Sequence, residues 1–210
     1  MIKLLIADDH AVVREGLKRI LAETPDLVVA GEAGDGQEAL DRVRAEAWDM
    51  VLLDISLPGM SGLDALKQLK RERPRLPVLV LSIYPEDQYA VRVLKAGASG
   101  YLTKDSAPDQ LIAAIRKISL GRKFVSPYLA EKLAVDLATD TERPLHERLS
   151  DREYQVLCLI ASGKTVKEIA AGLSLSVKTV STYRIRILKK MNVKSNAELI
   201  HYALQRGLAE

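Results

Sequence analysis

Short apolar runs alternate with amphipathic segments over the first 120 residues of the chain. The apolar runs are of strand length and predict β-strands at Ile2–Ala7, Leu27–Glu32, Met50–Ile55, Val78–Ser82 and Gly100–Leu102. The amphipathic segments predict helices near Val12–Ala22, Gln37–Glu46, Gly62–Arg73, Asp87–Ala96 and Pro108–Leu120. Five consecutive strand–helix units predict a doubly wound α/β domain with a five-stranded parallel sheet.

The pattern changes after residue 121. Ser126–Ala138 can form a short helix, and the polar run Thr139–Pro144 ends in proline and predicts a linker. From Leu149 onward the pattern is helical, with helices expected near residues 151–162, 166–172, 177–191 and 195–206. The prediction is an α/β domain at 1–121, a linker with a possible short helix at 122–146 and a small all-α four-helix domain at 147–210.

Two of the predicted C-terminal helices are separated by a tight turn. The turn Gly172–Ser176 contains glycine, and Ser176 is a good N-cap for the longer helix that follows. This layout is typical of a helix-turn-helix. On the longer helix an apolar stripe is expected to face the core and comprises Val177, Val180, Ile187 and Met191. The outward face suits a DNA major groove and carries Lys178, Ser181, Thr182, Ile185 and Lys189.

Charge is distributed unevenly along the chain. Residues 1–120 carry 16 Lys and Arg against 18 Asp and Glu, whereas residues 146–210 carry 11 against 6. A near-neutral first part and a basic last part indicate that only the last part binds a polyanion, here double-stranded DNA.

The apolar runs also bear on the compartment. They are of strand length, well short of the ~20 residues that a membrane-spanning helix needs. The first residues enter a strand at once, without a signal-peptide layout. Cys158 is the single cysteine, so no intrachain disulfide can form. We expect a cytoplasmic protein without membrane contact.

Charged residues follow three of the predicted strands. Asp8 and Asp9 come after the first strand, Asp54 ends the third, and Lys104 follows the fifth. The carboxyl ends of parallel strands meet at one edge of the sheet, where ligands bind. Carboxylates gathered there repel each other unless a cation joins them, and a few hard oxygen ligands suit Mg²⁺, or Mn²⁺ in its place. Acids, a divalent metal and a lysine together indicate phosphoryl chemistry.

Two groups of motifs, in order along nearly the whole chain, resemble one known family. The first group comprises Asp8-Asp9, Asp54 to Gly62, Ser82 and Gly97 to Lys104. The second group comprises Leu149 to Glu153, Ile160 to Gly163, Lys167 to Ala170 and Ser176 to Val180. On these motifs the chain resembles the two-component response regulators of the NarL/FixJ type. These join a flavodoxin-like phosphoacceptor receiver domain, here 1–121, to a LuxR-type helix-turn-helix domain, here 147–210.

The resemblance implies roles for the acidic residues. Asp54 would accept a phosphoryl group from a cognate histidine kinase. Asp8 and Asp9 would hold Mg²⁺, and the backbone carbonyl of Ser56 would be a further metal ligand.

The resemblance also implies how the signal leaves the site. Lys104 would contact the phosphoryl oxygens, Ser82 would donate its hydroxyl to the phosphate, and Tyr101 would move inward with Ser82 as an aromatic switch. The change would reach dimerisation and DNA binding. The expected protein is a phosphorylation-controlled transcription regulator, homodimeric on DNA or when phosphorylated, and not an enzyme with a separate substrate.

The resemblance and the outward face of the predicted helix at residues 177–191 together indicate the expected DNA contacts. They are Lys164, Thr165, Lys167, Lys178, Thr179, Ser181, Thr182, Ile185, Arg186 and Lys189. The chain departs from the family pattern at two positions. Asp105 stands where many receivers have proline after the lysine, which makes a cis peptide there less expected. Tyr183 stands where many LuxR-type helices carry histidine.

Two other functions remain open from the residues alone. The helical domain could bind a protein instead of DNA, although its basic charge argues against this. A phosphatase of the haloacid dehalogenase kind also uses an aspartate nucleophile on an α/β sheet. That class needs its second acid two residues after the nucleophile, whereas Asp8 and Asp9 are adjacent.

Overall fold

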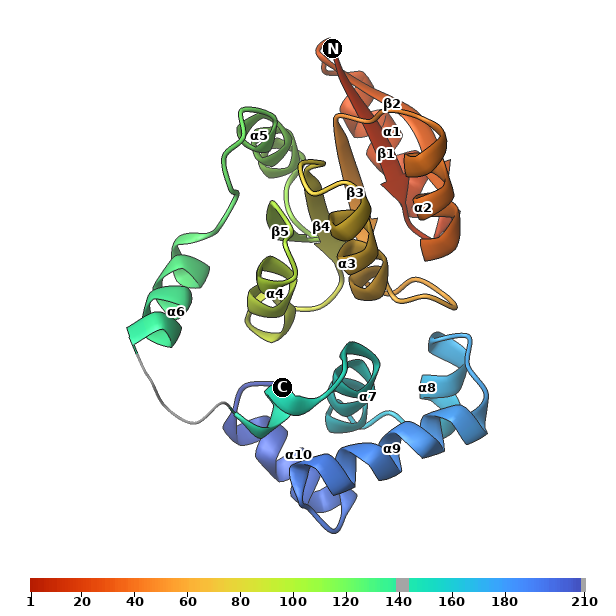
Figure 1. Ribbon diagram of the computed structural model, residues 1–210, viewed down its shortest axis with the longest axis vertical. Helices are drawn as coiled ribbons and strands as arrows, with labels where there is room; N and C mark the ends of the chain where they lie inside the picture. The colour runs from red at the N-terminus through yellow and green to blue at the C-terminus, as the bar shows by residue number, and fades with distance from the viewer. Residues whose placement is uncertain (139–143, 209–210) are drawn as a thin grey trace. The chain divides into compact units, whose positions relative to one another are not determined.

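The computed structural model describes residues 1–138 and 144–208. Contacts divide the chain into two compact units, Met1–Leu133 and Ala134–Glu210 (Figure 1). Residues 139–143, most of the predicted linker segment Thr139–Pro144, lie outside the described residues.

The first unit is a parallel sheet between two layers of helices. Its strands are β1 (Ile2–Ala7), β2 (Leu27–Ala33), β3 (Met50–Asp54), β4 (Val78–Ser82) and β5 (Gly100–Thr103). The helices that follow them are α1 (Ala11–Ala22), α2 (Gly36–Ala45), α3 (Gly62–Glu72), α4 (Glu86–Lys95) and α5 (Pro108–Ser119). The strand order is β2-β1-β3-β4-β5, as in flavodoxin-like sheets. The predicted fold class is confirmed, and each predicted element end lies within one residue of the observed one.

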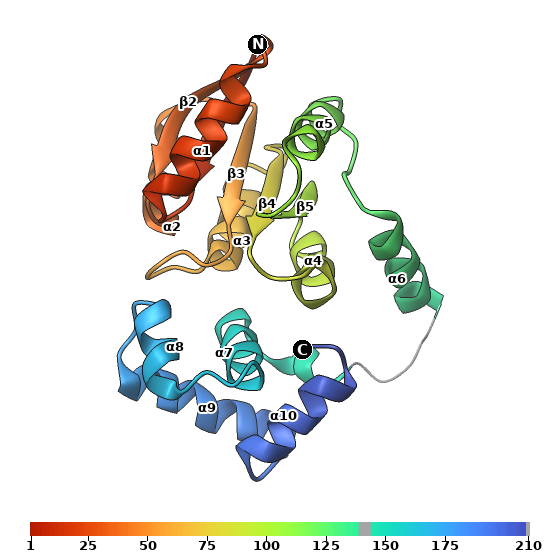
Figure 2. The ribbon, with the colours of Figure 1, turned by 180° about the vertical axis from the view of Figure 1, so that it is seen from behind.

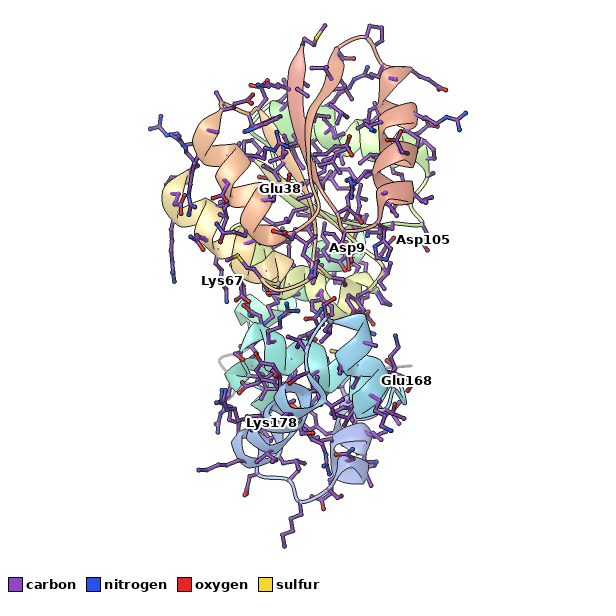
Figure 3. All side chains as sticks on the ribbon, turned by 90° about the vertical axis from the view of Figure 1, so that its right-hand side faces the viewer. Asp9, Glu38, Lys67, Asp105, Glu168 and Lys178 are labelled. Carbon is purple, nitrogen blue, oxygen red and sulfur yellow. The ribbon has the colours of Figure 1, made fainter. Side chains whose placement is uncertain are left out.

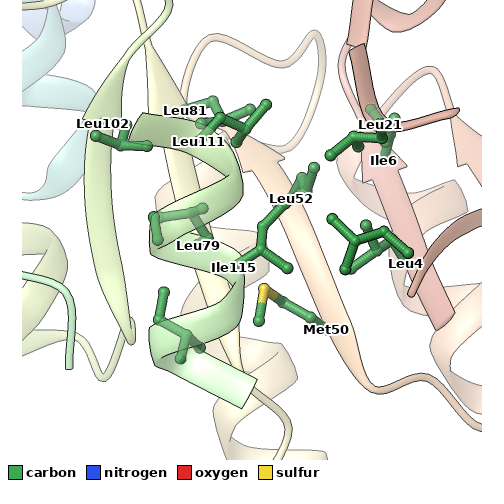
Figure 4. Packing of buried hydrophobic residues seen from close by; sticks show 13 residues of the cluster. Leu4, Ile6, Leu21, Met50, Leu52, Leu79, Leu81, Leu102, Leu111 and Ile115 are labelled. Atoms are coloured by element: carbon green, nitrogen blue, oxygen red, sulfur yellow. The ribbon is translucent and has the colours of Figure 1, made fainter. Parts of the chain in front are cut away.

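The two helix layers bury the sheet on both faces. Figure 2 shows α1 and α5 in front of one face, and Figure 1 shows α2, α3 and α4 in front of the other. On the α1/α5 face, alternate side chains of the strands pack against Leu21 of α1 and Leu111 and Ile115 of α5 (Figure 4). Every residue of β3 and β4 is buried. This explains why these two strands have unbroken apolar sequences.

The register of the strands sets which residues share the carboxyl edge of the sheet. Ala7 of β1 pairs with Leu53 of β3, and Asp54 then pairs with Leu81 of β4. Ser82 pairs in turn with Thr103 of β5. The residues just after these pairs therefore gather at one edge.

The chain leaves α5 along the free edge of β5. Phe124 forms a parallel bridge with Gly100, and its backbone N–H donates to the Ser99 carbonyl at 2.9 Å. The Ser126 hydroxyl donates to Glu86 of α4 at 2.7 Å and accepts from the Leu129 N–H at 3.1 Å, so it caps the next helix. The possible short helix is therefore present, as α6 (Pro127–Ala138).

The second unit is helical. It comprises the 3₁₀ helix η1 (Leu145–Arg148), α7 (Asp151–Ala161), α8 (Val166–Gly172), α9 (Val177–Met191) and α10 (Asn196–Gln205). Capping boxes begin α7 at Ser150 with Glu153 and α8 at Thr165 with Glu168. Helix α9 packs on α7 and α8, and α10 packs on α7. The four predicted helices are present, whereas η1 was not predicted because four residues are too short for a periodic signal.

Among the described residues, none of the helices is both long enough and apolar enough to cross a bilayer.

Candidate functional site

The ammonium group of Lys104 lies between two buried carboxylates. Its Nζ is 2.8 Å from Asp54 Oδ2 and 2.6 Å from Asp8 Oδ2. Both aspartates are 2% exposed. The Lys104 backbone N–H donates to the Ser82 carbonyl at 2.7 Å, which ties the lysine to the end of β4. One fixed cation thus pairs with two acids that would otherwise repel each other.

Burial governs the protonation of this cluster. It raises the pKa of the Asp54 carboxyl, and the charge of Lys104 opposes this only in part. For Lys104 itself, burial lowers the pKa, but Asp54 and Asp8 outweigh that effect and the pKa is raised overall. The lysine therefore stays charged at neutral pH. A poorly solvated carboxylate beside a fixed ammonium is suited to attack a phosphoryl group whose oxygens gain negative charge.

Asp9 and His10 extend the cluster toward solvent (Figure 3 labels Asp9). His10 Nδ1 lies 2.8 Å from Asp9 Oδ1 and 3.4 Å from Asp8 Oδ1. One ligand atom each from Asp8, Asp9, His10 and Asp54 falls within 4.8 Å of the others. The three carboxylates are hard oxygen donors, and the pocket that they form is compatible with a divalent cation.

Helix α3 approaches the backbone of Asp54 very closely at Gly62. A Cβ atom at position 62 would lie 1.8 Å from the Asp54 carbonyl oxygen, and the Gly62 N–H donates to the Ile55 carbonyl at 3.0 Å. The Ser56 N–H donates to Asp54 Oδ1 at 3.1 Å, and the Ser56 hydroxyl is buried without a partner among the described residues. The loop after β3 therefore orients the Asp54 carboxylate through backbone groups.

Ser82 and Tyr101 meet through the backbone of Tyr84. Ser82 is fully buried, and its Oγ accepts from the Tyr84 N–H at 3.1 Å. The Tyr101 hydroxyl donates to the Tyr84 carbonyl at 2.7 Å, and the ring is 2% exposed. Tyr101 is thus in an inward position, where burial raises the pKa of its hydroxyl. The peptide bond between Lys104 and Asp105 is trans.

Arg14, which the sequence did not single out, contacts the backbone of the acidic pair. The Arg14 guanidinium donates to the Asp8 carbonyl at 2.7 Å and to Glu32 Oε2 at 2.8 Å. Lys18 Nζ is 2.7 Å from Glu32 Oε1. Arg14 lies on α1 and Glu32 on β2, and no pattern in the sequence links a side chain to a particular carbonyl oxygen.

The outward face of α9 carries basic, hydroxyl and aliphatic groups. Lys178, Thr182, Ile185, Arg186 and Lys189 are exposed, Ile185 by 63%, and Lys178 is labelled in Figure 3. Lys164, Thr165 and Lys167, at the start of α8, are also exposed. Such a surface has the groups that read base edges and phosphates.

Several residues of the second unit have other positions or partners than the sequence predicted. Val177 does not face the core: it is 47% exposed, because it is the first residue of α9 and precedes the turn that packs on α7. Thr165 caps α8, and the hydroxyls of Thr179 and Ser176 lie 2.8 Å apart. Ser181 is half-buried. These hydroxyls already have roles within the unit, and their DNA contacts stay predictions.

The C-terminal end of α9 is tied to the start of α7. Lys190 Nζ lies 2.6 Å from Glu153 Oε2, and the Glu153 carboxylate, with its side chain 3% exposed, also accepts from the Ser150 N–H at 2.8 Å. Burial opposes ionisation of Glu153, but the hydrogen bond from Lys190 and those at Ser150 outweigh it, so its pKa is lowered. Lys190 therefore supports the placement of α9, although both Lys189 and Lys190 are exposed.

Each of the two units matches a known protein family. Residues 4–116 match the response regulator receiver domain, and residues 147–203 match the bacterial regulatory proteins of the luxR family. The response regulator UvrY of Escherichia coli K12 is 38% identical over 210 residues, which cover 99% of this chain and 96% of UvrY. The response regulator GacA of Pseudomonas aeruginosa is 37% identical and covers 100% of this chain and 99% of its own.

Solved structures of RcsB are similar over both units. RcsB of Salmonella typhimurium matches with a TM-score of 0.68 and 27% identity, over 98% of each chain. A structure of Salmonella enterica RcsB bound to promoter rprA with the phosphomimetic BeF₃⁻ matches with a TM-score of 0.65 and 28% identity, over 96% of this chain and 98% of that one. From its two domains and full-length relatives, the chain belongs to the two-component response regulators of the NarL/FixJ type, which regulate transcription through a LuxR-type DNA-binding domain.

Proposed function

We propose that this regulator is switched by phosphorylation of Asp54 by a cognate histidine kinase. The observation that supports this proposal is the Asp54–Lys104–Asp8 cluster. In it, Lys104 Nζ lies 2.8 Å from Oδ2 of the buried Asp54 carboxylate. A carboxylate oxygen of Asp54 attacks the phosphorus of a phosphohistidine. The new O–P bond forms as the N–P bond breaks, and the histidine nitrogen keeps the electron pair. The positive charge of Lys104 stabilises the negative charge on the phosphoryl oxygens.

The acidic residues fit a divalent cation. Asp8, Asp9 and Asp54 would hold Mg²⁺ or Mn²⁺ with the backbone carbonyl of Ser56, because three carboxylates with hard oxygen atoms converge there. When bound, the ion supplies charge neutralisation for the transferring group. His10 stays at the exposed rim, with its side chain 64% exposed.

The phosphoryl group then changes the residues next to the site. It adds about −1.5 to −2 charge and three acceptor oxygens. Ser82, whose Oγ accepts from the Tyr84 N–H, donates its hydroxyl proton to a phosphoryl oxygen, and the Lys104 ammonium moves toward the new negative charge. Movement of Ser82 and Tyr84 then reaches Tyr101, because the Tyr101 hydroxyl donates to the Tyr84 carbonyl. A switch from 1:99 to 99:1 needs about 5.5 kcal/mol of differential stabilisation, which a few charge-assisted hydrogen bonds and a metal can supply.

The output is binding of a homodimer to double-stranded DNA through α9. Its exposed face supplies Lys178, Thr182, Ile185, Arg186 and Lys189, and the start of α8 supplies Lys164, Thr165 and Lys167. Thr179 and Ser181, both partly buried, complete the set of expected contacts. The structures of RcsB in complex with DNA, one of them with promoter rprA, support this assignment. We assign residues 1–121 to the receiver, 122–146 to the linker and 147–210 to the DNA-binding domain.

A steep salt dependence of binding distinguishes DNA from a protein partner. With about six phosphate contacts, DNA affinity is expected to fall roughly 10³-fold between 50 and 200 mM salt. Duplexes selected from a random pool by the phosphorylated protein would be titrated by fluorescence anisotropy at several salt concentrations. Lys178→Ala should weaken binding, whereas Lys67→Ala on α3 is the matched control. A flat salt profile would favour a protein partner instead.

Tyr84 is expected to protect the phosphorylated state. It lies two residues beyond Ser82, and its ring stacks on Tyr89 with centroids 4.7 Å apart. Because a bulky side chain two residues beyond Ser82 is expected to flank the path of attacking water, Tyr84→Ala should shorten the half-life of the phosphoryl group several-fold. Decay of the phosphorylated protein would be followed by intact-mass spectrometry. Ile83→Ala removes an exposed neighbour and is the control. An unchanged half-life in Tyr84→Ala would refute the protective role.

A further inference from the structure

We infer that Arg14 is a positioning residue for the metal-binding acids, which rests on the proposed function. Its guanidinium joins the Asp8 carbonyl, at 2.7 Å, to the Glu32 carboxylate, at 2.8 Å. Arg14 therefore connects α1, the end of β2 and the turn that carries Asp8 and Asp9.

The Asp8–His10 turn is held at several points. Lys104 Nζ holds the Asp8 carboxylate, and the Arg14 side chain holds the backbone of the turn. The Asp8 N–H donates to the Ala33 carbonyl at 3.1 Å, and Asp8 Oδ1 accepts from the His10 N–H at 2.9 Å. These bonds fix the start of the turn and the Asp8 side chain. The bond from Arg14 to the Asp8 carbonyl fixes the peptide group that leads into Asp9, which is the more exposed member of the pair.

Glu32 keeps the guanidinium in place. Arg14 Nε and Lys18 Nζ both lie within 2.8 Å of its carboxylate, and these two hydrogen bonds, with Lys18 the stronger influence, lower the pKa of Glu32. The Arg14 side chain is 20% exposed, so the bridge is partly shielded from water. A planar guanidinium can span a carbonyl and a carboxylate in fixed directions, whereas an ammonium cannot reproduce that geometry.

Positioning and charge predict opposite effects on metal affinity. Arg14 carries a positive charge close to a cation site, so its removal should strengthen metal binding if charge alone acted. If Arg14 positions the acidic pair, its removal should weaken binding, because loss of groups that orient metal ligands typically costs about 10–100-fold in affinity.

The test is Mn²⁺ binding to the full-length protein, measured by electron paramagnetic resonance of the free ion. Arg14→Gln should raise the Kd for Mn²⁺ at least about 10-fold. Arg14→Lys should raise it as well, although it keeps the charge, and Glu32→Gln should raise it to a smaller extent. Arg116→Gln breaks the Arg116–Asp26 pair, in which an arginine of α5 donates to a carboxylate that is not part of the site, and should leave the Kd unchanged.

Unfolding in urea with a chelator present distinguishes a purely structural role of Arg14 from a role in positioning the metal ligands. A structural arginine would lower the urea midpoint and leave the Kd for Mn²⁺ of the folded protein unchanged. A Kd for Arg14→Gln equal to or below that of the wild type would overturn the inference. Absence of Mn²⁺ binding by the wild type itself would overturn the proposed metal site, and the inference with it.

Discussion

Asp54→Asn is expected to abolish both phosphorylation and phosphorylation-dependent dimerisation. The amide is not nucleophilic and removes the negative charge that pairs with Lys104 at 2.8 Å. Incubation with an acyl phosphate and a divalent metal should add a phosphoryl group to the wild type and none to the variant, by intact-mass spectrometry. Sedimentation with a phosphate mimic should show dimers for the wild type alone.

Asp49→Asn is the matched control for this substitution. Asp49 is an exposed acid just before β3, and it accepts a hydrogen bond from the Lys3 backbone N–H rather than from a site residue. It should be phosphorylated and should dimerise like the wild type. Equal dimer affinity for Asp54→Asn and for the wild type with the phosphate mimic would contradict the assignment of Asp54.

Gly62→Ala is expected to destabilise the first unit strongly and to displace Asp54. The new Cβ would lie 1.8 Å from the Asp54 carbonyl oxygen and 2.8 Å from the Ile55 Cα, so backbone must shift. Overpacking of this kind costs about 3 kcal/mol or more, because backbone atoms cannot rotate away. Urea unfolding would measure the loss of stability, and acyl phosphate labelling would measure the loss of phosphorylation of the remaining folded protein.

Gly16→Ala is the control and should have the opposite sign. Gly16 lies inside α1, and a Cβ there would meet nothing within 4 Å. Alanine is favoured over glycine by roughly 1 kcal/mol at an exposed helical position, so stability should rise. An equal stability change for the two variants would show that close approach at Gly62 is not the cause.

The sheet and the acid–lysine cluster could be predicted because each depends on a local pattern and one general rule. The apolar runs of β3 and β4 required burial on both faces, and parallel strands bring their carboxyl ends to one edge. Asp8, Asp54 and Lys104 therefore had to lie near each other. The start of α9 followed from its capping residue, Ser176.

Other features depend on contacts that the local pattern does not encode. The Arg14 side chain donates to a backbone carbonyl. Because every residue has such a carbonyl, the sequence does not identify the acceptor. Ser126 reaches Glu86 across 40 positions of the sequence. Val177 matched the apolar stripe of α9 by spacing, but at the first position of the helix it lies beyond the packed segment. In each case tertiary packing decides between partners that the sequence leaves equivalent.

The bridge between Phe124 and Gly100 has a consequence for where the receiver can be cut. Strand β5 is an edge strand of the sheet, and Phe124 covers part of its free edge. A fragment that stops at residue 121 would leave the Ser99 carbonyl without its donor and uncover that edge, which invites pairing with strands of other molecules. The residues assigned to the linker thus also protect the receiver from aggregation, and an isolated receiver should retain them through Leu133.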